Sequence, residues 1–372
     1  MTLPLSDLRV IDLSTVLAGP NCARYLADFG AQVIKVEHPD GGDSLRNMAW
    51  RDPRDGEGMW WKLVNRNKRT IALDLKAAAD LAVLRALVAD ADVLVENFRP
   101  GTLERLGLGP DALHEINPKL IITRVTGFGQ TGPYASRPGF ATIAEVMSGL
   151  SAISGLPEGQ PLLPPIALTD EVTGVVAAFA TMVALHSGVG QVVDVSLLES
   201  MFQLMGPLIT RYRLTGEQQE RLGAGLPYSV PRGTYECSDG KWVGLSASSD
   251  SVAARVLRVL GVDDDARFDT FTARMEHREE LESVMADWCR RHPQAEVLAT
   301  FSAAEAAIGP VMDMADISVD PHYAVREAIV EVEGTPMQGL LAKLSATPGA
   351  LRWQGRGLDA DGDEIREKGW TQ

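Results

Sequence analysis

An aspartate at the start of a long apolar segment is the first residue of interest for chemistry. Asp170 lies in the stretch 168–174 (LTDEVTG), where a helix is expected to begin. Aspartate is a preferred N-cap residue, because its oxygen accepts hydrogen bonds from the free N–H groups of the first turn. The same place keeps a carboxylate ionised and suits a nucleophile in acyl transfer. Spacing alone favours the capping role and leaves the nucleophile as the sharper alternative.

A glycine-rich loop follows one of the expected strands. Residues 127–132 (GFGQTG) match the GxGxxG pattern with which dinucleotide-binding proteins hold a pyrophosphate. Pro133 and Pro138 follow at once, so these glycines open no helix whose N-terminus could bind that group. The pattern therefore favours a Gly/Pro-rich loop at a strand end over a nicotinamide or flavin site. Such loops nevertheless lie where ligands bind in open α/β sheets.

A basic cluster, residues 65–69 (NRNKR), stands out in an acidic chain, and Lys76, Arg99 and Arg105 lie near other expected strand-to-helix junctions. A solvated surface is the usual explanation of such a cluster. Phosphate binding is the alternative, because Arg and Lys can offset the unfavourable overall charge locally. The six histidines are scattered without the spacing of a metal pair, and GxSxG, HExxH and Walker motifs are absent. Most familiar enzyme classes are thereby disfavoured, and no metal site is expected.

The first half of the chain must position these residues, and its pattern is that of βαβ units. Strands are expected at 9–13, 31–37, 70–75, 92–98, 120–125 and 191–195, with helices at 21–29, 76–91 and 170–186. The strands are apolar on both faces, as in a sheet that helices cover on both sides. The sequence therefore predicts an α/β fold with a mainly parallel sheet.

The second half differs in texture. A hairpin is expected at 234–247, turning at Asp239-Gly240, followed by amphipathic helices around 250–262, 278–291 and 294–308. Apolar strands at 328–333 and 340–344 could return to the first domain. We expect a large domain of residues 1–200 and 314–372, a smaller α+β domain of residues 223–312 and a linker at 201–222.

Composition limits the classes of partner and compartment. With 372 residues, 45% of them hydrophobic, and a formal net charge of −15, the chain suits a globular protein and disfavours binding to nucleic acid or an anionic membrane. Cys22, Cys237 and Cys289 are too far apart to suggest a disulfide framework or a zinc site. We see neither a signal peptide nor a run approaching the roughly 18 apolar residues of a membrane span. A soluble, cytoplasmic protein is expected.

Several stretches carry a resemblance, and they keep their order over the first two hundred residues. They are 9–14 (RVIDLS) with 18–20 (AGP), 26–37 (LADFGAQVIKVE), 42–43 (GD), 67–76 (NKRTIALDLK), 92–101 (DVLVENFRPG), 127–134 (GFGQTGPY), 138–140 (PGF), 148–149 (SG), Asp170 and 190–196 (GQVVDVS). Together they resemble the class III CoA-transferase family, also called the CaiB/BaiF family. That family includes formyl-CoA and carnitine CoA-transferases and α-methylacyl-CoA racemases.

The resemblance implies a Rossmann-like large domain built from both chain ends, a smaller domain between them, and an interlocked homodimer. In the transferases, the aspartate at the position of Asp170 attacks the acyl-CoA thioester to give a mixed anhydride and CoA thiolate. The thiolate then forms an aspartyl-CoA thioester, which passes CoA to the acceptor acid. Acyl-CoA and a carboxylic acid are thus the expected partners, with coenzyme A as part of the substrate and no permanently bound cofactor.

The family's CoA contacts carry over residue by residue. They fall on Val16, Leu17, Ala18, Leu73, Leu75, Lys76, Asn97, Phe98 and Arg105. Apolar members of this set are expected to sandwich adenine, and basic members to meet phosphates. His38 stands where some members have Arg, and Arg137 is expected to face the CoA phosphate or the pantetheine region.

The racemase branch is the main alternative. Those enzymes pair the aspartate with a histidine from a Gly-His-Asp stretch, one base on each face of the α-carbon. Here the stretch reads Gly139-Phe140-Ala141, so one base is missing and a transferase is favoured. A noncatalytic acyl-CoA-binding homologue is a third reading. Glu145 stands where Gln is common, and no tetraglycine loop is present, which leaves the identity of the exchanged acids open.

Overall fold

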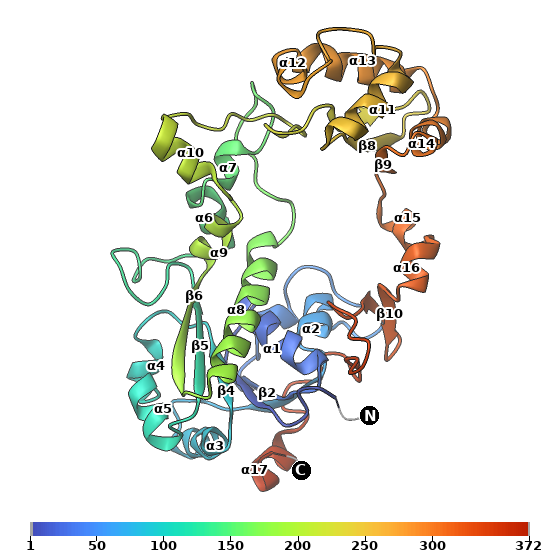
Figure 1. Cartoon of the computed structure of the whole chain (residues 1–372). Coiled ribbons are helices and arrows are strands. Elements are labelled where there is room, and N and C mark those ends of the chain that lie inside the picture. The colour runs from blue at the N-terminus through green and yellow to red at the C-terminus, as the bar shows by residue number, and fades with distance from the viewer. Residues whose placement is uncertain (1–2, 371–372) are drawn as a thin grey trace. The chain divides into compact units, whose positions relative to one another are not determined.

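The computed structural model of the protein describes residues 3–370, which form two compact units. The larger unit comprises Met1–Leu150, Leu163–Gly206 and His322–Gln372, and the smaller one Ser151–Leu162 and Pro207–Pro321. The larger unit is therefore built from both ends of the chain (Figure 1).

A six-stranded parallel sheet forms the centre of the larger unit. Its strands are β1 (Arg9–Asp12), β2 (Gln32–Glu37), β3 (Lys68–Ala72), β4 (Val93–Glu96), β5 (Ile121–Thr126) and β6 (Gln191–Ser196). The spatial order is β3-β2-β1-β4-β5-β6, with every neighbouring pair parallel. All six expected strands are present, and the α/β fold class is confirmed. The strand order reverses direction between β1 and β4, where open α/β sheets bind ligands.

Helices cover both faces of this sheet. Successive residues of a strand point to opposite faces, so neighbouring strand residues pack against different helices. Val10 and Val93 pack into one apolar cluster with α1 (Ala18–Asp28) and α8 (Leu168–Ser187). Ile11 and Leu94, their immediate neighbours in sequence, pack into a second cluster with α3 (Ala78–Ala89) and α5 (Pro110–Ile116). The C-terminal helix α17 (Gly362–Lys368) adds Ile365 to this second cluster.

The helix α8 corrects one expectation from the sequence. It is 20 residues long, with a mean hydropathy of 1.5, and among residues 3–370 it is the one helix long and apolar enough to cross a membrane. The expectation that no run approaches that size was therefore wrong. A core helix of a soluble protein passes the same test, and α8 packs closely on α1: a Cβ added at Gly174 would lie 2.7 Å from the Cβ of Asn21.

The return of the chain to the larger unit includes an antiparallel hairpin of β10 (Ile329–Val332) and β11 (Thr335–Gln338). The turn residues Glu333 and Gly334 both have positive φ, 49° and 75°, as a two-residue hairpin turn requires. The expected strand at 340–344 is not a strand. Instead β11 carries Pro336, which an edge strand of a two-stranded sheet tolerates.

The smaller unit contains a three-stranded antiparallel sheet in the order β7-β8-β9 and several helices. Its strands are β7 (Arg232–Glu236), β8 (Trp242–Ser246) and β9 (Ala307–Pro310). Its longer helices are α11 (Asp250–Leu260), α13 (Arg278–Arg290) and α14 (Gln294–Ala303). The expected hairpin at Asp239-Gly240 is confirmed, with Gly240 at φ 75°.

Shorter helices complete the chain. They are η1 (Ser44–Arg46), α2 (Met59–Val64), α4 (Thr102–Arg105), α6 (Ala141–Met147), α7 (Leu150–Ile153), α9 (Leu197–Gln203), α10 (Leu208–Thr215), α12 (Phe271–Glu276), α15 (Met314–Val319) and α16 (Pro321–Val325). After β5 no helix begins before Ala141, so the GFGQTG loop opens no helix, as its prolines predicted. This loop therefore lacks the dinucleotide-binding geometry.

Candidate active site

A pocket of about 210 Å³ lies at the carboxyl edge of the parallel sheet, where β1 to β4 end. Its walls are Leu13, Thr15, Val36, Glu37, His38, Gly42, Asp43, Leu73, Asp74, Leu75, Lys76, Phe98 and Leu106. Five of these side chains belong to the predicted CoA contacts: His38, Leu73, Leu75, Lys76 and Phe98. The pocket adjoins the point where the strand order reverses, the usual ligand position in such sheets.

The turn after β1 joins the pocket to helix α1. Asn97, which follows β4, accepts a hydrogen bond from the backbone N–H of Thr15 (2.8 Å) and donates one to its carbonyl (2.7 Å). Val16 comes next, with a left-handed φ of 66°. Leu17 and Ala18 then begin α1 and are almost completely buried. Val16, Leu17 and Ala18 therefore lie on this turn, and a fourth predicted contact, Asn97, is hydrogen-bonded to it.

Positive charge is available on the rim of the pocket. The exposed side chain of Lys76 forms no ion pair with any part of the chain from residue 3 to 370. The guanidinium of Arg105, beside the pocket residue Leu106, donates within residues 3–370 only to the hydroxyl of Thr102 (2.8 Å). His38 Nε2 lies 4.0 Å from a carboxylate oxygen of Asp74. These side chains can meet a phosphate without first breaking a strong internal ion pair.

The basic cluster at residues 65–69 matches neither of the two interpretations offered for it, a solvated surface or a phosphate-binding site. Arg66 pairs with Asp28 (2.6 Å) and Lys68 with Asp12 (2.9 Å), and all four side chains are at most 1% exposed. The cluster is therefore neither a solvated surface nor a phosphate site at these two positions. Its charges are neutralised inside the protein.

Asp170 is not the N-cap of α8. The N-cap is Ala167, and Asp170 is the third residue of the helix. Within residues 3–370 its carboxylate accepts no hydrogen bond. Burial, with the negative charges of Glu171 and Glu145 adding to its effect, raises the pKa of Asp170 to about 6. The capping interpretation was wrong, and the carboxylate is ionised but unpaired at neutral pH.

The neighbours of Asp170 on its helix show what it faces. Ala167 and Gly174, three residues before and four after, share its face of the helix. Ala167 packs against the apolar cluster that contains Leu17, and a Cβ at Gly174 would lie 3.2 Å from the carbonyl oxygen of Ala18. Asp170 therefore lies on the face of α8 that contacts the start of α1.

Comparison with known proteins identifies the family. The model of CoA-transferase family III matches residues 5–361. The chain belongs to this family. It is 40% identical to the succinyl-CoA–D-citramalate CoA-transferase of Chloroflexus aurantiacus, over 97% of this chain and 93% of that protein. It is 35% identical to the succinate–glutarate CoA-transferase of Agrobacterium fabrum, over 94% and 91% of the two chains.

Solved structures have the same fold. A CaiB/BaiF family protein from Brucella suis superposes with a TM-score of 0.88 and 30% identity, over 99% of this chain and 100% of that one. Rv3272 from Mycobacterium tuberculosis gives a TM-score of 0.86 at 27% identity, over 97% and 99%. The predicted class, a class III CoA-transferase, is therefore confirmed.

Not every residue expected from the CoA-transferase family lies in the pocket. Arg137 is exposed in the loop after β5 and stacks its guanidinium on the ring of Tyr134, 4.0 Å from the ring centroid. Asp170 lies beyond the turn rather than in the pocket wall. Conversely, Thr15, Asp43 and Leu106 line the pocket without having been predicted. Asp43 could have been found, because it is part of one of the stretches that carry the resemblance.

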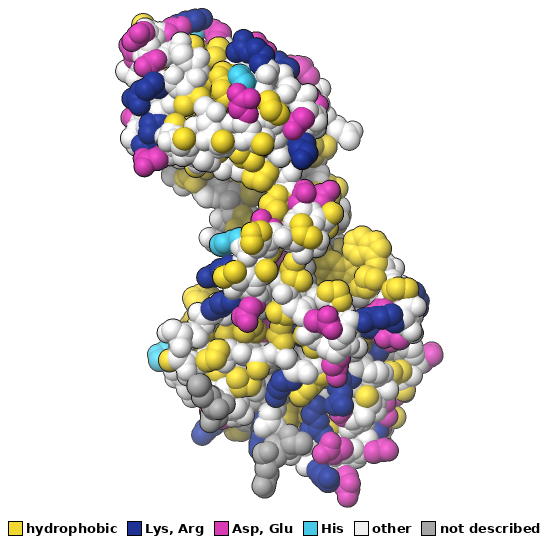
Figure 2. All heavy atoms as spheres, turned by 90° about the vertical axis from the view of Figure 1, so that its right-hand side faces the viewer, with side chains coloured by type: hydrophobic (Ala, Val, Ile, Leu, Met, Phe, Trp, Pro, Cys, Tyr) yellow, Lys and Arg dark blue, Asp and Glu magenta, His cyan; other side chains and the backbone are white. Residues whose placement is uncertain are grey.

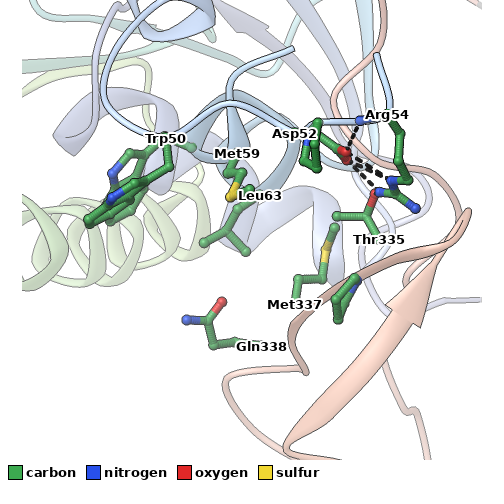
Figure 3. A pocket seen from close by; sticks show the side chains of 11 residues that line it. Trp50, Asp52, Arg54, Met59, Leu63, Thr335, Met337 and Gln338 are labelled. Carbon is green, nitrogen blue, oxygen red and sulfur yellow. Dashed lines mark hydrogen bonds and ion pairs between the residues drawn. The ribbon is translucent and has the colours of Figure 1, made fainter. Parts of the chain in front are cut away.

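A second pocket in this CoA-transferase, of about 400 Å³, holds none of the predicted site residues (Figure 3). Trp50, Met59 and Met337 contribute apolar wall. Its charged side chains are paired, since Arg54 Nε donates to Asp52 at 2.9 Å. Because its charges are already paired, this pocket is less suited to CoA phosphates than the one at the sheet edge.

Proposed function

We propose that the protein transfers CoA from an acyl-CoA to a carboxylic acid through a covalent intermediate on Asp170. The observation that carries this proposal is an unpaired, partly buried carboxylate, with its pKa raised to about 6, on the helix face that contacts the turn beside the pocket. A carboxylate that lacks hydrogen-bond donors is a better nucleophile than a solvated one, because it need not shed those donors before attack.

The steps follow from the reactivity of carboxylic acid derivatives. A carboxylate oxygen of Asp170 attacks the thioester carbonyl, the C–S bond breaks, and CoA thiolate leaves a mixed anhydride. The thiolate attacks the aspartyl carbonyl of this anhydride and releases the donor acid, which leaves an aspartyl-CoA thioester. The acceptor carboxylate attacks that thioester, and the thiolate then attacks the acyl carbonyl of the new anhydride. The products are a new acyl-CoA and free Asp170.

The pocket at the sheet edge is the proposed place for the adenine end of CoA. Leu73, Leu75 and Phe98 supply apolar surface for the base, and Lys76 and Arg105 supply charge for the phosphates. The pantetheine arm then runs past Thr15 along the turn at residues 16–18 towards Asp170. We retain His38 and Arg137 as predicted contacts at the edges of this path.

The substrates are proposed to be dicarboxylic. The relatives named above are transferases of succinyl-CoA with citramalate and of succinate with glutarate, and other relatives act on L-malate. Each of these acids carries a second carboxylate. We therefore propose succinyl-CoA as the donor and a short dicarboxylic acid as the acceptor.

A second copy of the chain is proposed as the partner of the exposed apolar face of α8. Phe179 is 70% exposed and Val183 54%, and Phe179 borders a groove of about 400 Å³ with Tyr25, Phe29 and Leu341. Figure 2 shows that hydrophobic side chains reach the surface between charged ones. Large exposed apolar patches are typical of interfaces, and the family resemblance implies an interlocked homodimer. Light scattering should give twice the chain mass, and a monomer would contradict this proposal.

The racemase alternative lacks support at its second base. Phe140 occupies the position of the expected histidine, is 70% exposed and cannot remove a proton. Incubation of an α-methylacyl-CoA in deuterated buffer should give no exchange at the α-carbon. Rapid exchange would favour the racemase.

The decisive experiment is mass spectrometry of the protein after incubation with succinyl-CoA alone. A CoA-sized adduct is expected on the peptide that contains Asp170. Asp170→Asn is the matched control: it should give no adduct and no CoA exchange, yet still bind CoA, because the pocket is unchanged. If the wild-type protein exchanges CoA but carries the adduct on a residue other than Asp170, the assignment of Asp170 is wrong.

A further inference from the structure

The turn between β1 and α1 holds a residue in an unfavourable conformation. Val16 has a φ of 66°, in the left-handed region that β-branched residues avoid. Such a conformation costs about 1–3 kcal/mol and persists only when its surroundings enforce it. The residues that enforce it can be identified from the contacts of the turn.

Asp43 binds the strained residue directly. Its two carboxylate oxygens each lie 3.2 Å from the backbone nitrogen of Val16, and one of them also accepts from the backbone N–H of Leu45 at 2.9 Å. Asp43 is 2% exposed, so water cannot replace these bonds easily. The left-handed turn is thus bound to a buried carboxylate that follows β2.

Lys35 keeps that carboxylate charged and in place. Its ammonium lies 3.2 Å from Asp43, both side chains are fully buried, and it also donates to the carbonyl of Ser14. Burial alone would lower the pKa of Lys35, but the carboxylates of Asp12 and Asp43 raise it. Lys35 is therefore a permanent positive charge beneath the turn.

The other end of the turn is held in the same way. Asp12 accepts from the backbone N–H of Ser14 (3.0 Å) and from Lys68 (2.9 Å), and Lys68 donates to the carbonyl of Pro20 (2.8 Å). Backbone groups on both sides of Val16 are therefore bound to buried charges.

We propose that Asp43 and Lys35 are positioning residues for the transfer reaction. They hold Val16 in its left-handed conformation, and so fix the backbone of Leu17 and Ala18 against the face of α8 that carries Asp170. The inference rests on the proposed role of Asp170. A displacement of about 1 Å in such a site can lower a rate about 100-fold.

The test is a double-mutant cycle between Asp43 and Val16. Asp43→Ala is expected to lower kcat about 10–100-fold, with the KM for succinyl-CoA within about threefold of wild type. Glycine adopts a left-handed φ without strain, so in a Val16→Gly background the turn no longer needs Asp43 to enforce it. The same Asp43→Ala change should there lower kcat at least about fivefold less, whatever Val16→Gly itself costs.

Asp28→Ala is the matched control, because Asp28 forms an equally buried ion pair, with Arg66, that does not touch the turn. It should lower Tm and leave kcat within about twofold at a temperature where the protein is folded. Lys35→Met replaces Asp43→Ala in the cycle if the latter does not fold. An equal loss of kcat from the Asp43 change in both backgrounds, or an equal loss in the control, would overturn the inference.

The outcomes for Asp170 and for the turn are separable. The mass of the adduct reports on Asp170 alone, in the wild-type protein. The cycle reports on coupling between Val16 and Asp43 in overall CoA exchange. An adduct on another residue with coupling intact would remove the Asp170 mechanism and keep the positioning role.

Discussion

The two sides of the β1–α1 turn use carboxylates in opposite ways. Beneath the turn, Asp12 and Asp43 are buried and fully paired, with Lys35, Lys68 and backbone N–H groups around them. On the side of α8, Asp170 is only partly buried, and it accepts no hydrogen bond from the described chain. The paired carboxylates hold the backbone, whereas the unpaired carboxylate has lone pairs available for the attack proposed above.

The largest expected effect is at Asp170. Asp170→Asn should lower CoA exchange by at least about 10⁴-fold, because it removes the proposed nucleophile. It should also stabilise the fold. The pKa of Asp170 rises from 3.8 to about 6 on folding, so the folded protein binds more protons between these values, and ionisation at pH 7 opposes folding. The variant should therefore gain up to about 3 kcal/mol in unfolding free energy at pH 7, measured by urea denaturation.

Asp12→Asn should act in the opposite direction on stability. It leaves two buried ammonium groups, those of Lys35 and Lys68, with one carboxylate fewer between them. Removal of one member of a buried ion pair typically costs about 3–5 kcal/mol. If both aspartate variants lowered the urea midpoint equally, the contrast between the two sides of the turn would be lost.

The local sequence pattern predicted most of the secondary structure of the larger unit. It predicted little of the contrast between paired and unpaired charged groups. Each of the six strands contains a short apolar stretch that the sequence displays directly, although β3 and β6 also carry charged residues. The burial of Arg66 and Lys68 is not local, because their partners Asp28 and Asp12 lie 38 and 56 residues away in sequence. The sequence pattern alone cannot tell these buried cations from the exposed Lys76, because all three are basic residues in similar positions. Their pairing in three dimensions separates them.

The cap of α8 shows a second limit. Aspartate is a good N-cap residue, so capping propensity places the start of the helix at Asp170. The helix instead begins at Leu168, after the poor N-cap residue Ala167, which packs against the cluster of Leu17 and Trp61. Packing therefore overrides capping propensity and leaves the carboxylate free. The proposed role of Asp170 was accessible only through the family resemblance.

The same contrast between unpaired and paired groups exists among the lysines, and an effect of intermediate size on activity is expected there. Lys76→Ala should raise the KM for succinyl-CoA about tenfold or more, because a charged hydrogen bond to phosphate contributes about 1.5–3 kcal/mol. Its Tm should hardly change, since the side chain has no ion pair in the described chain. Lys68→Met should lower Tm instead. Isothermal calorimetry with CoA and thermal denaturation separate the two, and a Lys76 variant with unchanged CoA affinity would argue against the pocket.

The smallest expected effect concerns the acid limb of the rate profile. Because attack needs ionised Asp170, kcat/KM should fall as the pH drops below about 6, the pKa to which burial, Glu171 and Glu145 together raise this group. Glu145→Gln removes one of the negative charges and should move the limb to lower pH. Glu115→Gln, on α5 at the opposite face of the sheet, is the control and should leave it in place. If the acid limb stays at the same pH in Glu145→Gln, another group limits the reaction at low pH, and the limb does not report the ionisation of Asp170.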